Sequence, residues 1–118
     1  MNRPILKNID FGSADLNIYQ PDSPDDFCIW LTLLIGPDDA EGGHLFQVGV
    51  CTVAWLAHQV SISRPCVLRH MILVERFDYS LIERTIITIV ENTQSLGWEK
   101  SVPVLSRFFA WEYEDYQS

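Results

Sequence analysis

Two stretches in the first half of the chain, residues 27–35 and 44–51, have the composition of β-strands. The first, FCIWLTLLI, is rich in β-branched and aromatic residues and is too short for a typical helix. In the second, HLFQVGVC, one set of residues, Phe46, Val48 and Val50, alternates with another, Leu45, Gln47, Gly49 and Cys51. Because the sequence from Gly36 to Asp39 has strong turn chemistry, we expect an antiparallel hairpin with an acidic, glycine-containing loop.

One register of this hairpin sorts its side chains onto two faces, because partners across antiparallel strands share a face. On the apolar face the pairs are Ile29 with Val50, Leu31 with Val48, and Leu33 with Phe46. On the other face they are Trp30 with Gly49, Thr32 with Gln47, and Cys28 with Cys51. We expect the first face to form the core, since the second is only half apolar.

Weaker patterns assign the rest of the chain up to residue 76. They predict an edge strand at 5–11, with Ile5, Ile9 and Phe11 on one face, followed by a surface loop at 12–26. After the hairpin they predict a short helix at 53–60, capped by Thr52, with Val53, Leu56 and Val60 on one side. A connector at 61–65 then leads to a third central strand at 66–76. The apolar middle of this third strand, MILV, suits burial on both faces.

Helical periodicity dominates the last third of the chain. A helix at 79–95 is predicted by a stripe of Ile82, Ile86, Ile89 and Leu96, with Ser80 and Glu83 at capping-box spacing. A second helix at 98–109 places Trp98, Val102, Leu105 and Phe109 on one face. Proline is tolerated only in the first turn of a helix, so Pro103 leaves the start of this helix open. After it, the aromatic and acidic positions of 111–116 largely alternate, which favours an extended segment.

Strands followed by two helices indicate an α+β fold. We expect a mostly antiparallel sheet of about four strands with the helices packed on one face, in one domain over residues 1–118. The other face of the sheet is then left for a partner.

Charge and composition narrow the classes of protein. The 118 residues include 16 acidic and 8 basic ones, for a formal net charge of −8, which repels nucleic acid and anionic membranes and suits a basic partner. The amino terminus has no apolar run long enough for a signal peptide, and no stretch approaches the roughly 20 apolar residues of a membrane helix. We therefore expect a cytoplasmic protein.

The residues of catalytic and metal sites are present but scattered. Three cysteines without CxxC spacing argue against a disulfide scaffold or a zinc site and favour buried free thiols. The dipeptide Arg69-His70 lies on a predicted strand, so His70 is expected to be a packed, hydrogen-bonded histidine rather than a base. No GxGxxG, Walker, HExxH or EF-hand pattern occurs, so we expect no enzyme, cofactor or metal.

A set of short motifs, in this order along the chain, resembles the immunity protein 8 family of bacterial polymorphic-toxin systems. They are Ile35-Gly36-Pro37, Phe46, Val50-Cys51-Thr52, Trp55-Leu56, Arg69-His70, the run from Ile72 to Val74, Trp98, Leu105-Ser106-Arg107, and the tail Trp111-Glu112-Tyr113-Glu114-Asp115-Tyr116. Val53, where the family pattern has a proline, and Pro103 depart from it. The resemblance implies a cytoplasmic protein that binds the carboxy-terminal toxic domain of a secreted toxin, in many cases a nuclease, and blocks it without chemistry.

Candidate toxin-binding residues combine acids with aromatic side chains. They are Trp30, Asp38, Asp39, Glu41, Glu112, Tyr113, Glu114 and Asp115. We favour the terminal cluster as the interface, because it interleaves carboxylates with rigid aromatic rings. A third group of acids, Asp22, Asp25 and Asp26, is expected at the opposite end of the sheet from the hairpin loop. Two other interpretations remain. The first is a small-ligand domain or enzyme that uses the sheet face around Trp30. The second is an adaptor that forms homodimers through that face, although the sequence gives no separate support for a homo-oligomer.

Overall fold

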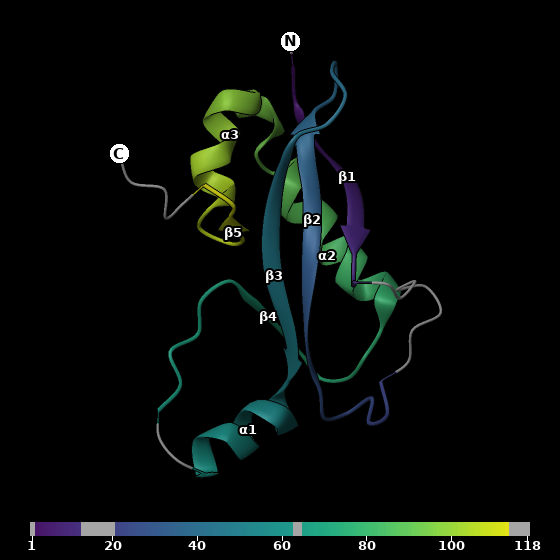
Figure 1. Ribbon diagram of the computed structural model, residues 1–118, viewed down its shortest axis with the longest axis vertical. Helices are drawn as coiled ribbons and strands as arrows, with labels where there is room; N and C mark the ends of the chain where they lie inside the picture. Colours follow the sequence, from purple (N-terminus) through teal and green to yellow (C-terminus); the bar gives the residue numbers. More distant parts are fainter. Residues whose placement is uncertain (1, 13–20, 63–64, 114–118) are drawn as a thin grey trace.

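The computed structural model describes residues 2–12, 21–62 and 65–113. Its strands are β1 (Pro4–Asp10), β2 (Cys28–Pro37), β3 (His44–Thr52), β4 (Met71–Val74) and β5 (Ala110–Trp111). Its helices are α1 (Val53–Ile62), α2 (Tyr79–Glu91) and α3 (Trp98–Leu105), with a 3-10 turn η1 (Gln94–Leu96) before α3. The strands form one sheet in the order β1-β2-β3-β4, with β5 also paired to β3, so the α+β prediction is confirmed (Figure 1).

The hairpin of β2 and β3 has the register expected from its alternation. The two strands pair antiparallel from Cys28 opposite Cys51 to Ile35 opposite His44. All six predicted pairs are therefore confirmed, and the side chains of the predicted apolar face are buried.

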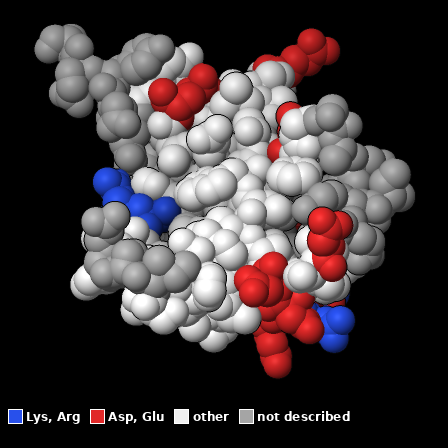
Figure 2. Space-filling model, turned by 60° about the horizontal axis from the view of Figure 1, so that its bottom comes forward, with Lys and Arg blue, Asp and Glu red and all other residues white. Residues whose placement is uncertain are grey.

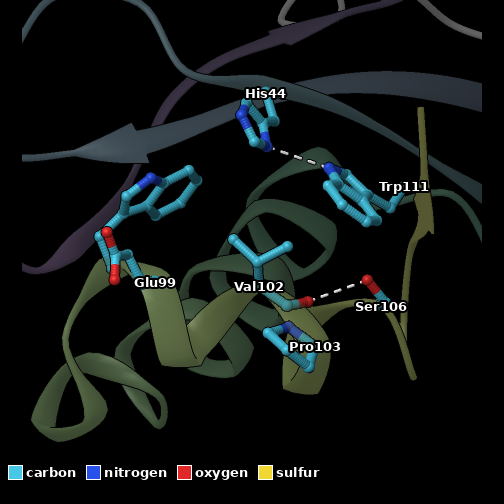
Figure 3. A pocket seen from close by; sticks show the side chains of 7 residues that line it. His44, Glu99, Val102, Pro103, Ser106 and Trp111 are labelled. Carbon is cyan, nitrogen blue, oxygen red and sulfur yellow. Dashed lines mark hydrogen bonds between the residues drawn. The ribbon is translucent and has the colours of Figure 1, made fainter. Parts of the chain in front are cut away.

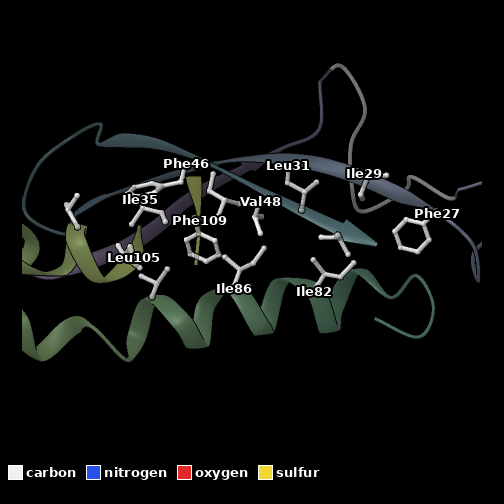
Figure 4. Close-up of a cluster of buried hydrophobic side chains, with 14 residues drawn as sticks. Phe27, Ile29, Leu31, Ile35, Phe46, Val48, Ile82, Ile86, Leu105 and Phe109 are labelled. Carbon is white, nitrogen blue, oxygen red and sulfur yellow. The ribbon is translucent and has the colours of Figure 1, made fainter. Parts of the chain in front are cut away.

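The core lies between this face of the sheet and the helices α2 and α3. Figure 4 shows the side chains of β2 and β3 pointing toward Ile82 and Ile86 of α2, with Phe109 beside them. The buried cluster consists of Phe27, Ile29, Leu31, Leu33, Ile35, Phe46, Val48, Val50, Ile82, Ile86, Val90, Val102, Leu105 and Phe109. Removal of this apolar surface from water is the main stabilising contribution to the fold.

Two short strands share the outer edge of β3. β4 runs parallel to residues 49–52 of β3, and β5 runs antiparallel to residues 46–47. The prediction of a central strand at 66–76 was wrong, because only the apolar run MILV pairs and it does so at an edge. The residues before it, 65–69, are exposed, and His70 interrupts the extended chain with a φ of 61°.

β1 is an edge strand, as predicted, but its inward residues differ. An irregularity between Leu6 and Asn8 shifts the register against β2. As a result Leu6, rather than Ile5, joins Ile9 and Phe11 against the core.

α2 begins at Tyr79, as predicted, but its N-cap and its end differ from the prediction. Asp78, not Ser80, is the N-cap, and its side chain accepts the backbone N–H of Leu81. The carboxylate of Glu83 instead accepts the Tyr79 hydroxyl proton at 2.9 Å. Because α2 ends at Glu91, Leu96 falls in η1, where its side chain is exposed instead of completing the buried stripe.

α3 is shorter than the predicted helix and contains Pro103 in its interior. Phe109 is fully buried although it lies beyond the helix end at Leu105. Since proline has no backbone N–H, residue 103 cannot donate the usual helical hydrogen bond to the carbonyl of Glu99. The first half of α3 therefore carries a carbonyl without that bond.

α1 begins where predicted, directly after Thr52. The Thr52 hydroxyl oxygen accepts the N–H groups of Trp55, at 3.2 Å, and Phe27, at 3.1 Å, so it caps the helix and holds the start of β2. The predicted apolar side of α1 does not face the core, because Val53 and Val60 are about half exposed. The helix lies at the lower end of the sheet, away from α2 and α3 (Figure 1). None of the described helices has the length and apolar character needed to span a membrane.

Candidate functional site

The end of the sheet near the hairpin loop brings the predicted hairpin acids together with Glu112, the described acid of the terminal cluster. The loop carrying Asp38, Asp39 and Glu41 connects β2 to the start of β3. Glu112 lies beside that start, because its N–H donates to the Leu45 carbonyl at 3.0 Å. From the sequence the hairpin and terminal clusters were alternative binding sites, whereas the structure places Glu112 of the terminal cluster at the same end of the sheet as the hairpin acids. Residues 21–26 lead into the opposite end of β2, as predicted for the third cluster.

Two of the predicted binding acids have partners within the chain. The Asp38 carboxylate accepts the backbone N–H of Arg3 at 3.0 Å and its Nε at 3.4 Å, and the backbone hydrogen bond is the main reason why the pKa of Asp38 is lowered. The Glu112 carboxylate accepts the N–H of Leu45 at 2.5 Å. These two carboxylates hold chain segments in place. Asp39 and Glu41 are exposed, and Glu114 and Asp115 lie outside the described residues.

Four rings form an aromatic cluster at this end of the sheet. The His44 ring lies 5.4 Å from Trp98, 5.7 Å from Trp111 and 5.3 Å from Tyr113, measured between centroids, and the two indoles come from α3 and β5. The Trp111 indole N–H donates to Nδ1 of His44 at 3.0 Å. This bond requires a lone pair on Nδ1, so it forms with the imidazole tautomer that carries its proton on Nε2.

A pocket of about 490 Å³ opens between α3, β5 and the start of β3 (Figure 3). In Figure 3, His44 and Trp111 lie across the pocket from Val102 and Pro103. Its lining residues are His44, Trp98, Glu99, Val102, Pro103, Ser106 and Trp111. Aromatic and apolar side chains thus dominate its wall, and Glu99 contributes a carboxylate.

Sequence reasoning missed His44, Trp98 and Glu99 as members of one site. Glu99 and Val102 of α3 and its C-cap residue Ser106 are spaced at i, i+3 and i+7, which places them on one helix face. That spacing was a usable signal on the helix alone. The approach of the helix to His44, more than 50 residues earlier, was not available from local pattern.

A second hollow, of about 460 Å³, lies beside β5 and is lined by residues of the open sheet face. The lining consists of Thr32, Leu45, Gln47, Ala110, Trp111 and Glu112. Because Trp111 lines both hollows, the β5 segment separates them. A partner that docked at this end would contact rings and carboxylates from several elements at once.

Trp30 occupies the position predicted for it on the open sheet face. A Cβ atom added to Gly49 would lie 3.0 Å from Cζ2 of Trp30 and 3.0 Å from Cε of Met71, so the indole rests directly over the glycine. Its exposed fraction is 49%. Gly49 is four residues along β3 from Leu45, about 14 Å at the usual strand rise, so Trp30 lies apart from the aromatic cluster.

One part of the molecule carries no acid. All 16 acidic residues lie in 1–41 and 75–118, so β3, α1 and β4 contribute none. The half-exposed or more exposed apolar residues in this part include Val53, Val60, Val67, Leu68 and Leu73. Figure 2 shows the end of the molecule where α1 lies as a broad uncharged area with acidic side chains at its margin. A basic partner is therefore attracted to other surfaces.

The thiols and histidines do not assemble into a reactive site. Cys28 and Cys51 face each other as free cysteines, and burial raises the pKa of both thiols, which disfavours thiolate. Cys66 is exposed, contrary to the expectation of buried thiols. Nε2 of His70 lies 3.2 Å from the Ser106 carbonyl, as predicted for a hydrogen-bonded histidine. Over the described ranges, no group of three or more metal-binding side chains occurs.

The chain was compared with known protein families, curated proteins and solved structures. Residues 5–116 match the sequence model of a protein family described as Immunity protein 8. Searches of curated proteins and of solved structures found no match.

Proposed function

Because the chain belongs to the immunity protein 8 family, we propose that it binds the carboxy-terminal toxic domain of a bacterial polymorphic toxin in the cytoplasm and occludes it. The toxic domain in this proposal is a nuclease. The protein acts by occupying its target in a complex, without turnover of its own.

The observation that carries the proposal is the meeting of acids and rings at the hairpin end of the sheet. Exposed Asp39 and Glu41 lie at the same end as the cluster of His44, Trp98 and Trp111. A nuclease needs a basic groove for phosphates, and an acidic surface competes for that groove and speeds association. Half-buried rings supply the desolvated contacts that give an interface most of its affinity.

Stoichiometric inhibition also suits the chemistry of the described side chains. The Cys28 and Cys51 thiols have raised pKa values, and His70 is hydrogen-bonded to a backbone carbonyl. Loss of a measured activity on replacing Cys51 or His70 would instead support an enzyme.

The test uses the carboxy-terminal domain of the protein encoded immediately upstream of this chain's gene. We expect co-expression to restore growth of cells that make this domain, and the purified pair to form a stable complex. In a nuclease assay, activity should fall in proportion to added protein and reach zero at a fixed molar ratio. Failure to form a complex, or protection that requires only catalytic amounts, contradicts occlusion.

A further inference from the structure

We propose that the pocket between α3 and β5 binds an arginine side chain of the toxin. This inference rests on the proposed function and assigns one subsite within it. The pocket is lined by His44, Trp98, Glu99, Val102, Pro103, Ser106 and Trp111 and has a volume of about 490 Å³, which is ample for one long side chain.

The walls of the pocket suit a flat cation. The indoles of Trp98 and Trp111 both border the His44 ring, at centroid distances of 5.4 Å and 5.7 Å. Tryptophan faces attract cations through the ring quadrupole more strongly than other aromatic rings do. A guanidinium group is planar and weakly hydrated, so it can stack between such rings more readily than the compact ammonium of lysine.

The carboxylate of Glu99 complements the donors of a guanidinium. Its side chain is exposed and, within the part of the chain that the structure describes, makes no salt bridge. A guanidinium carries five N–H donors and can bond to both oxygens of one carboxylate.

The other charged and titratable groups near the pocket are compatible with a bound cation. Nδ1 of His44 accepts the Trp111 N–H, so this ring nitrogen offers no N–H donor that would compete with a bound cation. Lys100, which follows Glu99, does not line the pocket but lines an adjoining hollow, to which Trp98 and Glu99 also contribute. The formal net charge of −8 further favours a basic ligand.

The first experiment uses a small probe and the four tryptophans as reporters. The peptide acetyl-Gly-Arg-Gly-amide is added to the ¹⁵N-labelled protein, and the indole N–H signals are followed by NMR. We expect the signals of Trp98 and Trp111 to shift, while Trp30 and Trp55, which do not line the pocket, keep theirs. The same peptide with citrulline in place of arginine, which keeps the shape and removes the charge, should shift them much less.

Matched variants test which groups recognise the probe. Glu99→Gln should weaken arginine-peptide affinity about two- to fivefold, as expected for loss of one exposed charge pair, while Glu75→Gln at another exposed site leaves it unchanged. Trp98→Leu should weaken it by a similar or larger factor. Because Trp98 also packs against the core, Glu99→Gln, at an exposed side chain, is the decisive variant.

The toxin domain provides the second experiment and separates the two proposals. If the wild-type protein binds the toxin, Glu99→Gln should reduce affinity about tenfold and Glu75→Gln should not, since charge pairs desolvated in an interface contribute more. The pocket assignment is overturned if Glu99→Gln and Glu75→Gln both bind the toxin as the wild-type protein does and if the arginine and citrulline peptides shift the indole N–H signals equally. The proposed function stays intact in that case. Absence of any wild-type complex overturns the proposed function. Tighter binding of the citrulline peptide would mark a subsite for neutral ligands and also overturns the assignment.

Discussion

The Trp111 indole N–H donates a hydrogen bond to Nδ1 of His44 and thereby ties β5 to the first residue of β3 across 67 positions of sequence. His44→Phe removes the acceptor and leaves a half-buried N–H without this partner. We expect a loss of about 1–2 kcal/mol in the free energy of unfolding, measured in urea. His58→Phe, at an exposed position of α1, is the control and should change stability little. Equal effects of both substitutions would show that the bond contributes nothing specific.

The bond between Asp38 and Arg3 gives stability a pH dependence. The folded-state pKa of Asp38 is lowered, so its contribution is present above the unfolded pKa and is lost as pH falls through the folded value. We expect wild type to exceed Asp38→Asn in urea stability at pH 7, with the difference shrinking below about pH 4. Asp39→Asn is the control. A difference that stays constant down to pH 2 would contradict this origin.

Trp30 tests whether the open sheet face contributes to binding. Because about half of the indole is exposed, we expect Trp30→Ala to cost about 1–2 kcal/mol, compared with about 3–5 kcal/mol for truncation of the buried Phe46. If Trp30 contacts the toxin, the variant keeps its circular dichroism spectrum and binds at least about tenfold more weakly. A collapse in stability would assign Trp30 to packing alone.

Charge reversal distinguishes the terminal acids from the hairpin acids. Since Glu112 and Asp38 bond to their own chain, the informative pairs are Glu114→Lys with Asp115→Lys, and Asp39→Lys with Glu41→Lys. We expect the terminal pair to weaken toxin binding by about 2–4 kcal/mol if its acids meet buried basic groups, and mainly to slow association if they only steer. If the variant with the hairpin pair of substitutions no longer protects cells and the variant with the terminal pair still does, the interface lies at the hairpin loop.

The sequence predicted the parts of the fold that depend on neighbours along the chain. Alternation and turn residues were enough for the β2–β3 register, and an apolar stripe was enough for α2. β4 and β5 have four and two residues, too few to show a period, and their pairing with β3 depends on distant segments. The bulge in β1 was likewise invisible, because it appears only against its partner strand.

The candidate site was predictable in composition but not in arrangement. The acids and rings of the tail were recognised as binding residues from their chemistry. The hydrogen-bond partners of the acids could not be predicted, since Asp38 of the hairpin bonds to a residue 35 positions away and Glu112 of the tail to one 67 positions away. The pocket combines α3 with a strand end, so it exists only after folding.

The two short strands on the outer edge of β3 also affect how the protein behaves at high concentration. An unpaired strand edge offers N–H and carbonyl groups to any other chain, which leads to aggregation. β4 covers residues 49–52 of that edge and β5 covers residues 46–47, so two segments from distant parts of the sequence keep it closed. Detachment of the β5 segment, whether by truncation or by a partner that pulls on it, would open the edge at residues 46–47 to intermolecular strand addition.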